Sequence, residues 1–244
     1  MKKLIALLFI GILSTSAFAQ QQQERKIKSN GVAMEKKRRV PKYTKLLIEG
    51  EVIVEILNND FNKEILTFGD ANLHQLLQIS VVNELLTIKR KPGFTIIGQT
   101  TPLRVKLTTK DLTDITVIGN KANVANMGVF EASKLSLTNT GDGKLDLRVK
   151  VDELEIKTEN NASITVDGNA NILKITSNSS GDINLQDLSN FYTEITSNGS
   201  GNVYTNTVNT IDGEINGSGN VYYKFTKTLN ITENGEGKIL KHEN

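Results

Sequence analysis

Alternating apolar and polar residues fill the second half of the chain, and short turns interrupt the alternation at regular intervals. From about residue 113 onward, seven copies of this pattern follow one another, roughly 18 to 20 residues apart. Each copy has apolar residues at every second position, a turn built from Gly, Ser, Asn or Asp, and a further short alternation. The clearest copies are residues 173–185, 193–205 and 213–223. The period of two predicts β-strands, and a repeat of this length predicts a stacked solenoid.

The solenoid that fits this repeat is a right-handed parallel β-helix with about 19 residues in each turn. Stacking the copies about 4.8 Å apart pairs their backbone groups and closes an apolar core. The expected core residues are Leu137, Leu145, Ile156, Ile164, Ile175, Ile183, Ile195 and Val203. The expected members of a side-chain amide ladder near the turns are Asn139, Asn160, Asn178 and Asn198. The spacing leaves one alternative open, an antiparallel sandwich of hairpins.

Glycine recurs in the turns of the repeat, where it allows the backbone to adopt positive φ. In the copy at residues 160–162, asparagine replaces glycine, and asparagine also tolerates left-handed geometry. These departures indicate that the phrase shapes a turn. The predicted structural turn residues are Gly141, Gly143, Gly181, Gly199, Gly201, Gly217, Gly219, Gly235 and Gly237.

Residues 41–110 alternate less regularly but still predict strands. Asn83 and Glu84 separate two alternating runs, as expected of a hairpin turn. Within residues 71–78, Leu73, Leu76 and Leu77 fit one helical face and predict a single short helix. The chain is therefore divided into an N-terminal β region at 41–110 and a repeat solenoid region at 111–244.

The beginning of the chain predicts export. Residues 1–19 combine two lysines, an apolar stretch of about ten residues and a small-residue site at Ala17 and Ala19, the features of a cleaved signal peptide. Residues 20–40 contain a glutamine run and a basic cluster with little apolar periodicity, so they predict a flexible linker. We expect the mature protein in the periplasm, at the cell surface or outside the cell.

Charge and cysteine content narrow the function further. The chain has 29 Lys and Arg against 27 Asp and Glu, and the leader removes Lys2 and Lys3, which leaves equal numbers. A neutral chain has no overall field that attracts a phosphate backbone, which argues against nucleic-acid binding. Cysteine is absent, so we expect neither disulfides nor a zinc–thiolate site. After the leader, no stretch approaches the length of a transmembrane helix.

The turns of the last copies resemble a known protein family. Residues 217–223 read Gly-Ser-Gly-Asn-Val-Tyr-Tyr and residues 180–183 read Ser-Gly-Asp-Ile, phrases similar to those that recur in secreted head GIN domain proteins, the auto-transporter adhesins. The segment Val-x-Asn-x-x-Leu-x-Ile at 81–88 is also similar. The resemblance covers about residues 40–241. It implies an adhesion role and carries no defined chemistry.

Parallel β-helices also include polysaccharide lyases and hydrolases, whose sites combine carboxylates with Lys, Arg or Ca²⁺. The best candidates here are Asp142, Asp146, Asp152, Glu153, Glu155 and Asp182. Because Asp and Asn recur at the turn of most copies, we interpret the turn residues as caps of backbone N–H groups. His74 and His242 lie far apart in sequence and lack the spacing of a zinc site or a Ser-His-Asp triad. We therefore predict a protein that is not an enzyme and uses no metal or other cofactor.

Three tyrosines form the predicted ligand surface. Tyr204, Tyr222 and Tyr223 lie in adjacent copies, and flat aromatic rings with a polar edge suit sugars. Packing in the core or at a sheet edge is the alternative role. We expect an adhesin or scaffold module that contacts envelope polysaccharide or a surface protein, with self-association through the solenoid ends. The alternative functions are a carbohydrate-active β-helix enzyme and a periplasmic sensing or regulatory module.

Overall fold

The computed structural model describes residues 25–58, 64–98 and 101–242. These residues form nineteen β-strands and one 3₁₀ helix, η1 (His74–Leu76). The strands are β1 (Arg25–Lys28), β2 (Ala33–Arg39), β3 (Lys45–Glu49), β4 (Ile53–Leu57), β5 (Glu64–Asp70), β6 (Leu77–Val82), β7 (Leu85–Arg90), β8 (Phe94–Ile97), β9 (Arg104–Thr108), β10 (Asp114–Ile118), β11 (Asn123–Met127), β12 (Phe130–Thr140), β13 (Lys144–Asn160), β14 (Ser163–Ser179), β15 (Ile183–Ser197), β16 (Val203–Ile215), β17 (Val221–Tyr223), β18 (Thr228–Glu233) and β19 (Ile239–Lys241). The predicted signal peptide, with Ala17 and Ala19, lies outside the described residues. Within the described ranges, the structure has no helix with the length and apolar character needed to span a membrane.

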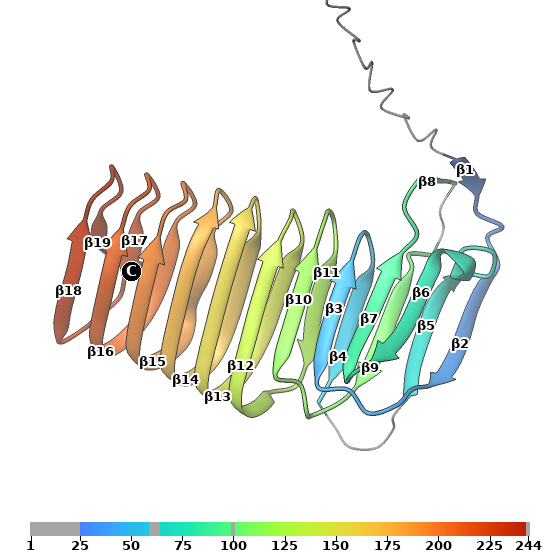
Figure 1. Ribbon diagram of the computed structural model, residues 1–244, viewed down its shortest axis with the longest axis horizontal. Helices are drawn as coiled ribbons and strands as arrows, with labels where there is room; N and C mark the ends of the chain where they lie inside the picture. Colours follow the sequence, from blue (N-terminus) through green and yellow to red (C-terminus); the bar gives the residue numbers. More distant parts are fainter. Residues whose placement is uncertain (1–24, 59–63, 99–100, 243–244) are drawn as a thin grey trace, which may run out of the picture.

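Parallel strands stack along the molecule and confirm the predicted solenoid (Figure 1). Leu135 lies beside Leu154, and Leu154 lies beside Leu173. Equivalent residues in these turns are 19 positions apart, and the interval falls to 18 in the last turns. The long strand β13 pairs with β11 near its start and with β12 over its remaining length, so it contributes to both faces of the solenoid. The antiparallel sandwich is wrong, because the repeat strands are parallel.

The predicted core residues are buried between the two faces. Each is at most 3 % exposed: Leu137, Leu145, Ile156, Ile164, Ile175, Ile183, Ile195 and Val203. They belong to one continuous apolar cluster that extends from Tyr43 to Val221. When one turn stacks on the next, the removal of these aliphatic side chains from water supplies the main favourable free energy.

The predicted boundary near residue 110 does not divide the structure. β3 pairs in parallel with β7 on one side and with β10 on the other. β4 pairs in the same way with β9 and β11. The turn formed by β3 and β4 therefore lies between two turns that come later in the chain. The sheets and the core therefore continue across residue 110, and the division into 41–110 and 111–244 stays a prediction about sequence regions.

The predicted linker at residues 20–40 contains two strands in its described part. β1 pairs in parallel with β8, and β2 pairs antiparallel with β5 at the N-terminal end of the solenoid. All seven residues of β2 are exposed, so they lack the apolar period that would reveal a strand. Backbone pairing holds β2 in place, together with ion pairs from Lys37 and Arg39 to Glu64 at 2.5 and 3.3 Å. The described part of the predicted linker therefore contains two paired strands.

The predicted short helix at residues 71–78 is reduced to η1, which has three residues. Leu77 already begins β6, and β6 turns at Asn83 and Glu84 into the antiparallel strand β7. These two residues have φ values of 49° and 61°, the left-handed geometry of a tight hairpin, which confirms the predicted turn. Leu73 and Leu76 lie in a small second core under β1 and β8. Their helical spacing thus reflects burial around one 3₁₀ turn.

The turn glycines have a different role from the predicted one. None of the nine has φ in the left-handed range. In all except Gly143, an added Cβ would lie 2.0 to 2.3 Å from a carbonyl oxygen of the neighbouring turn. At Gly201, for example, it would lie 2.1 Å from the oxygen of Gly181. Glycine is required there because stacked backbones approach closely. Positive φ does occur in the copy without these glycines, at Asn160 with φ of 62°.

Burial of Tyr43 makes the fold sensitive to alkaline pH. Its side chain is 5 % exposed, and burial raises the pKa of the phenol to about 12. An unfolded tyrosine ionises near pH 10, so the neutral phenol stabilises the fold fully below that pH. We expect this contribution to be lost between about pH 10 and pH 12, which urea unfolding at a series of pH values will measure. Tyr43→Phe removes the ionisable group, so the free energy of unfolding should depend less on pH in this range. The same pH dependence in the variant and the wild type would show that Tyr43 is not the group responsible.

Candidate functional site

Tyr204 and Tyr222 stack on each other near the C-terminal end of the solenoid. They are the second residues of β16 and β17, and the parallel register places them side by side. Their ring centroids are 4.9 Å apart and their planes differ by 10°. His242 meets both rings edge-on, with centroids 6.3 Å away. Tyr223 faces the other side of the strand and packs against the core, as strand alternation requires.

This geometry gives the tyrosines a packing role. Each ring covers one face of the other, and Leu240 lies beside Tyr222 in the next turn. Burial raises the pKa of Tyr204, and the nearby carboxylate of Asp182 raises it further. The structure thus brings together two of the three predicted residues and adds His242, whose position beside them the repeat pattern does not reveal. Sugar binding by these tyrosines stays a prediction.

Side chains at one turn cap the backbone of the next turn. Asp182 Oδ1 accepts the backbone N–H of Asn202 at 2.7 Å. Asn202 Oδ1 accepts that of Asn220 at 3.0 Å, and Asn220 Oδ1 accepts that of Lys238 at 2.9 Å. The predicted capping role is confirmed for this row. Either Asp or Asn can occupy a position in this row, because both residues supply a side-chain oxygen that accepts the backbone hydrogen bond.

The remaining candidate carboxylates lie on the outside of the solenoid. Glu153 forms ion pairs with Lys134 and Lys174 at 3.0 and 3.1 Å, and the hydrogen bond from Lys134 is the main cause of its lowered pKa. Asp152 accepts a hydrogen bond from a side-chain amide, Glu155 pairs with a lysine, and both Asp142 and Asp146 are exposed. Across the part of the chain that the structure describes, no three His, Cys, Asp or Glu residues cluster as a metal site.

His74 is part of the structure of the N-terminal end. Its side chain is 7 % exposed. Nε2 donates to the carbonyl oxygen of Met34 at 3.1 Å, and Nδ1 lies 3.2 Å from the hydroxyl of Thr67. Both ring nitrogens are therefore used in joining β2, β5 and η1, an arrangement expected of a buried polar group.

An exposed amide ladder follows the turns at the C-terminal half of the solenoid. Asn198 Nδ2 donates to Asn178 Oδ1 at 2.7 Å, and Asn216 Nδ2 donates to Asn198 Oδ1 at 2.9 Å. Asn234 Nδ2 continues the row by donating to Asn216 at 2.8 Å. All four side chains are exposed. Asn198, Asn216 and Asn234 each use one amide N–H within the ladder, so the second N–H of each remains available to a ligand.

The predicted ladder is correct at two positions and wrong at two. Asn139 lies beside Thr158, whereas Asn178 lies beside Glu159. Asn139 is therefore one position out of register and points inward, where its amide donates to two backbone carbonyl groups at 2.7 and 3.3 Å. Asn160 takes the left-handed turn position described above. Asn178 and Asn198 form the ladder, and the structure extends it to later turns.

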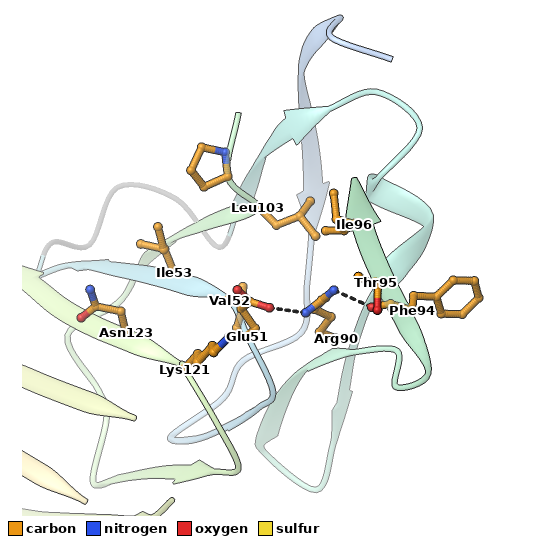
Figure 2. Close-up of a pocket in the computed structure, with 11 residues that line it drawn as sticks. Glu51, Val52, Ile53, Arg90, Phe94, Thr95, Ile96, Leu103, Lys121 and Asn123 are labelled. Carbon is orange, nitrogen blue, oxygen red and sulfur yellow. Dashed lines mark hydrogen bonds and ion pairs between the residues drawn. The ribbon is translucent and has the colours of Figure 1, made fainter. Parts of the chain in front are cut away.

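A cavity of about 600 Å³ lies near the N-terminal end, between the turns after β3 and β10 and the small sheet of β1 and β8 (Figure 2). Arg90 donates from Nη1 to Glu51 at 2.5 Å and from Nη2 to the carbonyl oxygen of Phe94 at 2.9 Å. Lys121 and Asn123 supply further polar groups. The remaining lining residues are Val52, Ile53, Thr95, Ile96, Pro102 and Leu103. The cavity has the size of a small-ligand site, and Arg90 serves first as a tie between β8 and the turn after β3.

A comparison with protein families places most of the chain in a known family. The model described as "Putative auto-transporter adhesin, head GIN domain" matches residues 42–226. No match was found among curated proteins.

Solved structures share the fold at low sequence identity. A putative adhesin from Bacteroides fragilis is 19 % identical, with a TM-score of 0.82, over 88 % of this chain and 100 % of that one. A putative adhesin from Parabacteroides distasonis is 22 % identical, with a TM-score of 0.71, over 89 % and 100 %. A protein from the same species described as a putative lipid binding protein is 17 % identical, with a TM-score of 0.70, over 88 % and 100 %. At these identities the likeness concerns the fold.

Proposed function

Since this chain belongs to the head GIN domain family of putative auto-transporter adhesins, we propose that it is an exported, non-enzymatic module that binds an extended polymer at the cell envelope. The ligand is an envelope polysaccharide or a surface protein. It lies along the solenoid axis and contacts several turns at once, without a metal or another cofactor.

The observation that carries this proposal is the exposed amide ladder of Asn178, Asn198, Asn216 and Asn234. Its members repeat at the spacing of the stacked turns, about 4.8 Å. A row of identical donors with one fixed spacing suits a ligand that is itself a repeating chain. Hydrogen bonds among the amides hold each side chain in place, which lowers the entropy lost on binding.

Weak contacts along the ladder add together. One hydrogen bond contributes only about 0.5–1.5 kcal/mol, so a single amide binds poorly. Several contacts made by one polymer act at a high effective concentration, and affinity then grows with the number of turns engaged. An adhesin of this kind distinguishes one polymer from another by the spacing of the hydrogen-bonding groups along it.

Removing the two central amides of the ladder tests the proposal. We expect Asn198→Ala combined with Asn216→Ala to weaken retention on an envelope-polysaccharide and surface-protein array about tenfold, because two ligand contacts are lost. The measurement uses the purified chain 20–244 and records both retention and soluble products.

A matched control replaces two half-exposed threonines on the flat face of neighbouring turns, Thr176→Ala with Thr196→Ala. This variant should bind like the wild type, and thermal unfolding should show that both proteins remain folded. Equal binding by the amide variant would remove the ladder from the proposal. Release of shortened polysaccharide would overturn the non-enzymatic assignment.

A further inference from the structure

The C-terminal turn leaves a sheet edge open on each face. In the described structure, β18 pairs with β16 alone and β19 pairs with β17 alone, and both lie at the left end in Figure 1. Leu229 and Leu240 are 38 % and 40 % exposed. Ile231 and Ile239 pack against the core from one side only. Unpaired backbone groups beside exposed apolar side chains form a surface that another strand can extend.

The opposite end of the solenoid is built differently. One of its two outer strands, β2, is antiparallel to its neighbour β5, and all the side chains of β2 are exposed. It carries Lys36, Lys37, Arg38 and Arg39 in succession. Charged residues on an edge oppose pairing with a further strand. The β2 edge therefore does not accept the apolar C-terminal turn of another molecule.

We propose that two copies of this chain associate through their C-terminal turns, with β18 antiparallel to β18 of the partner subunit and Asn230 on the two-fold axis. The axis runs perpendicular to the face that contains β18. That face then continues from one copy into the other, and the open end of the core is covered along β18. The contact is isologous and closes after two subunits.

The sequence of β18 is complementary to itself in this register. With Asn230 opposite its own copy, Leu229 lies opposite Ile231 of the partner subunit, and Thr228 lies opposite Thr232. Lys227, just before the strand, lies opposite Glu233. Each of these pairs occurs twice because of the symmetry. Apolar residues meet apolar residues and cations meet carboxylates, which is the pattern that stabilises antiparallel strands.

Glu233 has contacts within its own turn that agree with this role. Its carboxylate accepts the backbone N–H of Ile239 at 2.9 Å and pairs with Lys238 at 2.9 Å. These bonds fix the carboxylate at the end of β18 and lower its pKa, chiefly through the hydrogen bond from Ile239. Because a carboxylate offers several acceptor sites, it can also accept from Lys227 of the partner subunit.

Cysteine substitution tests both the contact and its register. The chain has no cysteine, so a single introduced thiol can form only an intermolecular disulfide. Directly opposed residues have Cα atoms about 4.5 to 5.5 Å apart, within the range that a disulfide requires. We expect Asn230→Cys to form a covalent dimer under mild oxidation, at protein concentrations where the wild type is dimeric by sedimentation equilibrium.

Thr232→Cys is the matched control, since Thr232 lies on the same strand and is also exposed. In the proposed register the two thiols introduced at position 232 are separated by four residues along the strand, about 13 Å, and should not join. A disulfide at 232 without one at 230 would overturn the register. A monomeric wild type over the full concentration range, without cross-linking at 230, would overturn the proposal.

A charge substitution provides a second test that preserves folding. Asn230 donates a hydrogen bond to Asp212 at 2.7 Å, so Asn230→Lys places a cation beside a carboxylate within its own chain. The same lysine meets its copy across the axis. We expect dimer dissociation constants to rise at least about tenfold, while thermal stability of the monomer is unchanged. Thr196→Lys adds the same charge far from the contact and should leave association unaffected. Dimer formation through β18 is independent of ligand binding by the amide ladder. A variant that loses one of these two properties can therefore still be tested for the other.

Discussion

Replacing Gly201 by alanine is expected to destabilise the protein by about 3 kcal/mol, because the new methyl group has no space. Its Cβ would lie 2.1 Å from the carbonyl oxygen of Gly181. A backbone oxygen in a stacked turn cannot move aside as the end of a flexible side chain can. The turn on the other side is equally close, since a Cβ on Gly219 would lie 2.0 Å from the oxygen of Gly201. Relief requires neighbouring turns to separate and thus weakens backbone pairing.

Urea unfolding followed by circular dichroism measures this effect. Ser200→Ala is the matched control, because it changes an exposed residue in the same turn and adds no atom to the stack. We expect the control to lie within about 0.5 kcal/mol of the wild type. An unfolding midpoint for Gly201→Ala equal to that of the control would show that the turns tolerate greater separation than the structure indicates.

Truncating Leu154 to alanine is expected to cost about 2–5 kcal/mol. Leu154 is completely buried, and it lies between Leu135 and Leu173 of the adjacent turns. The loss combines the transfer free energy of the removed methyl groups with the cost of the cavity they leave. A solenoid turn has neighbours above and below that are fixed by backbone pairing, so it collapses little around the gap.

Ile172→Ala is the control for this truncation. Ile172 is 39 % exposed at a corner of β14, so its removal leaves no closed cavity, and we expect a loss below about 1 kcal/mol. Calorimetry distinguishes the two variants through their unfolding temperatures. Similar losses for Leu154→Ala and Ile172→Ala would mean that burial in the central turns does not govern stability.

The repeat period was sufficient to predict the solenoid because every turn in the second half pairs with the next turn along the sequence. The same reasoning fails around β3 and β4, whose neighbours lie far away in the chain. Hydrophobic alternation marks a strand and a buried face but does not identify the partner strand. For β2 even this signal is missing, since its seven side chains are exposed and only its backbone is paired.

Register limited what could be predicted for the candidate site. Asn139 and Asn178 look equivalent in the turn phrases, yet they differ by one position in the stack and so face opposite sides. Tyr204 and Tyr222 could be placed in adjacent copies from spacing alone. Their stacking and the edge contact of His242 depend on side-chain orientation, which the repeat does not specify.

The position of the turn formed by β3 and β4 has a consequence for folding during synthesis. Its strands are made early, but their neighbours on both faces come later: Thr44 bonds to Glu84, 40 residues away, and to Thr113, 69 residues away. The central repeats need loops of only about 19 residues. Contacts between distant residues form slowly because loop closure costs entropy before pairing repays it. The last repeats to leave the ribosome can therefore fold readily, while the first strands must remain open, and accessible to chaperones, until their later neighbours arrive.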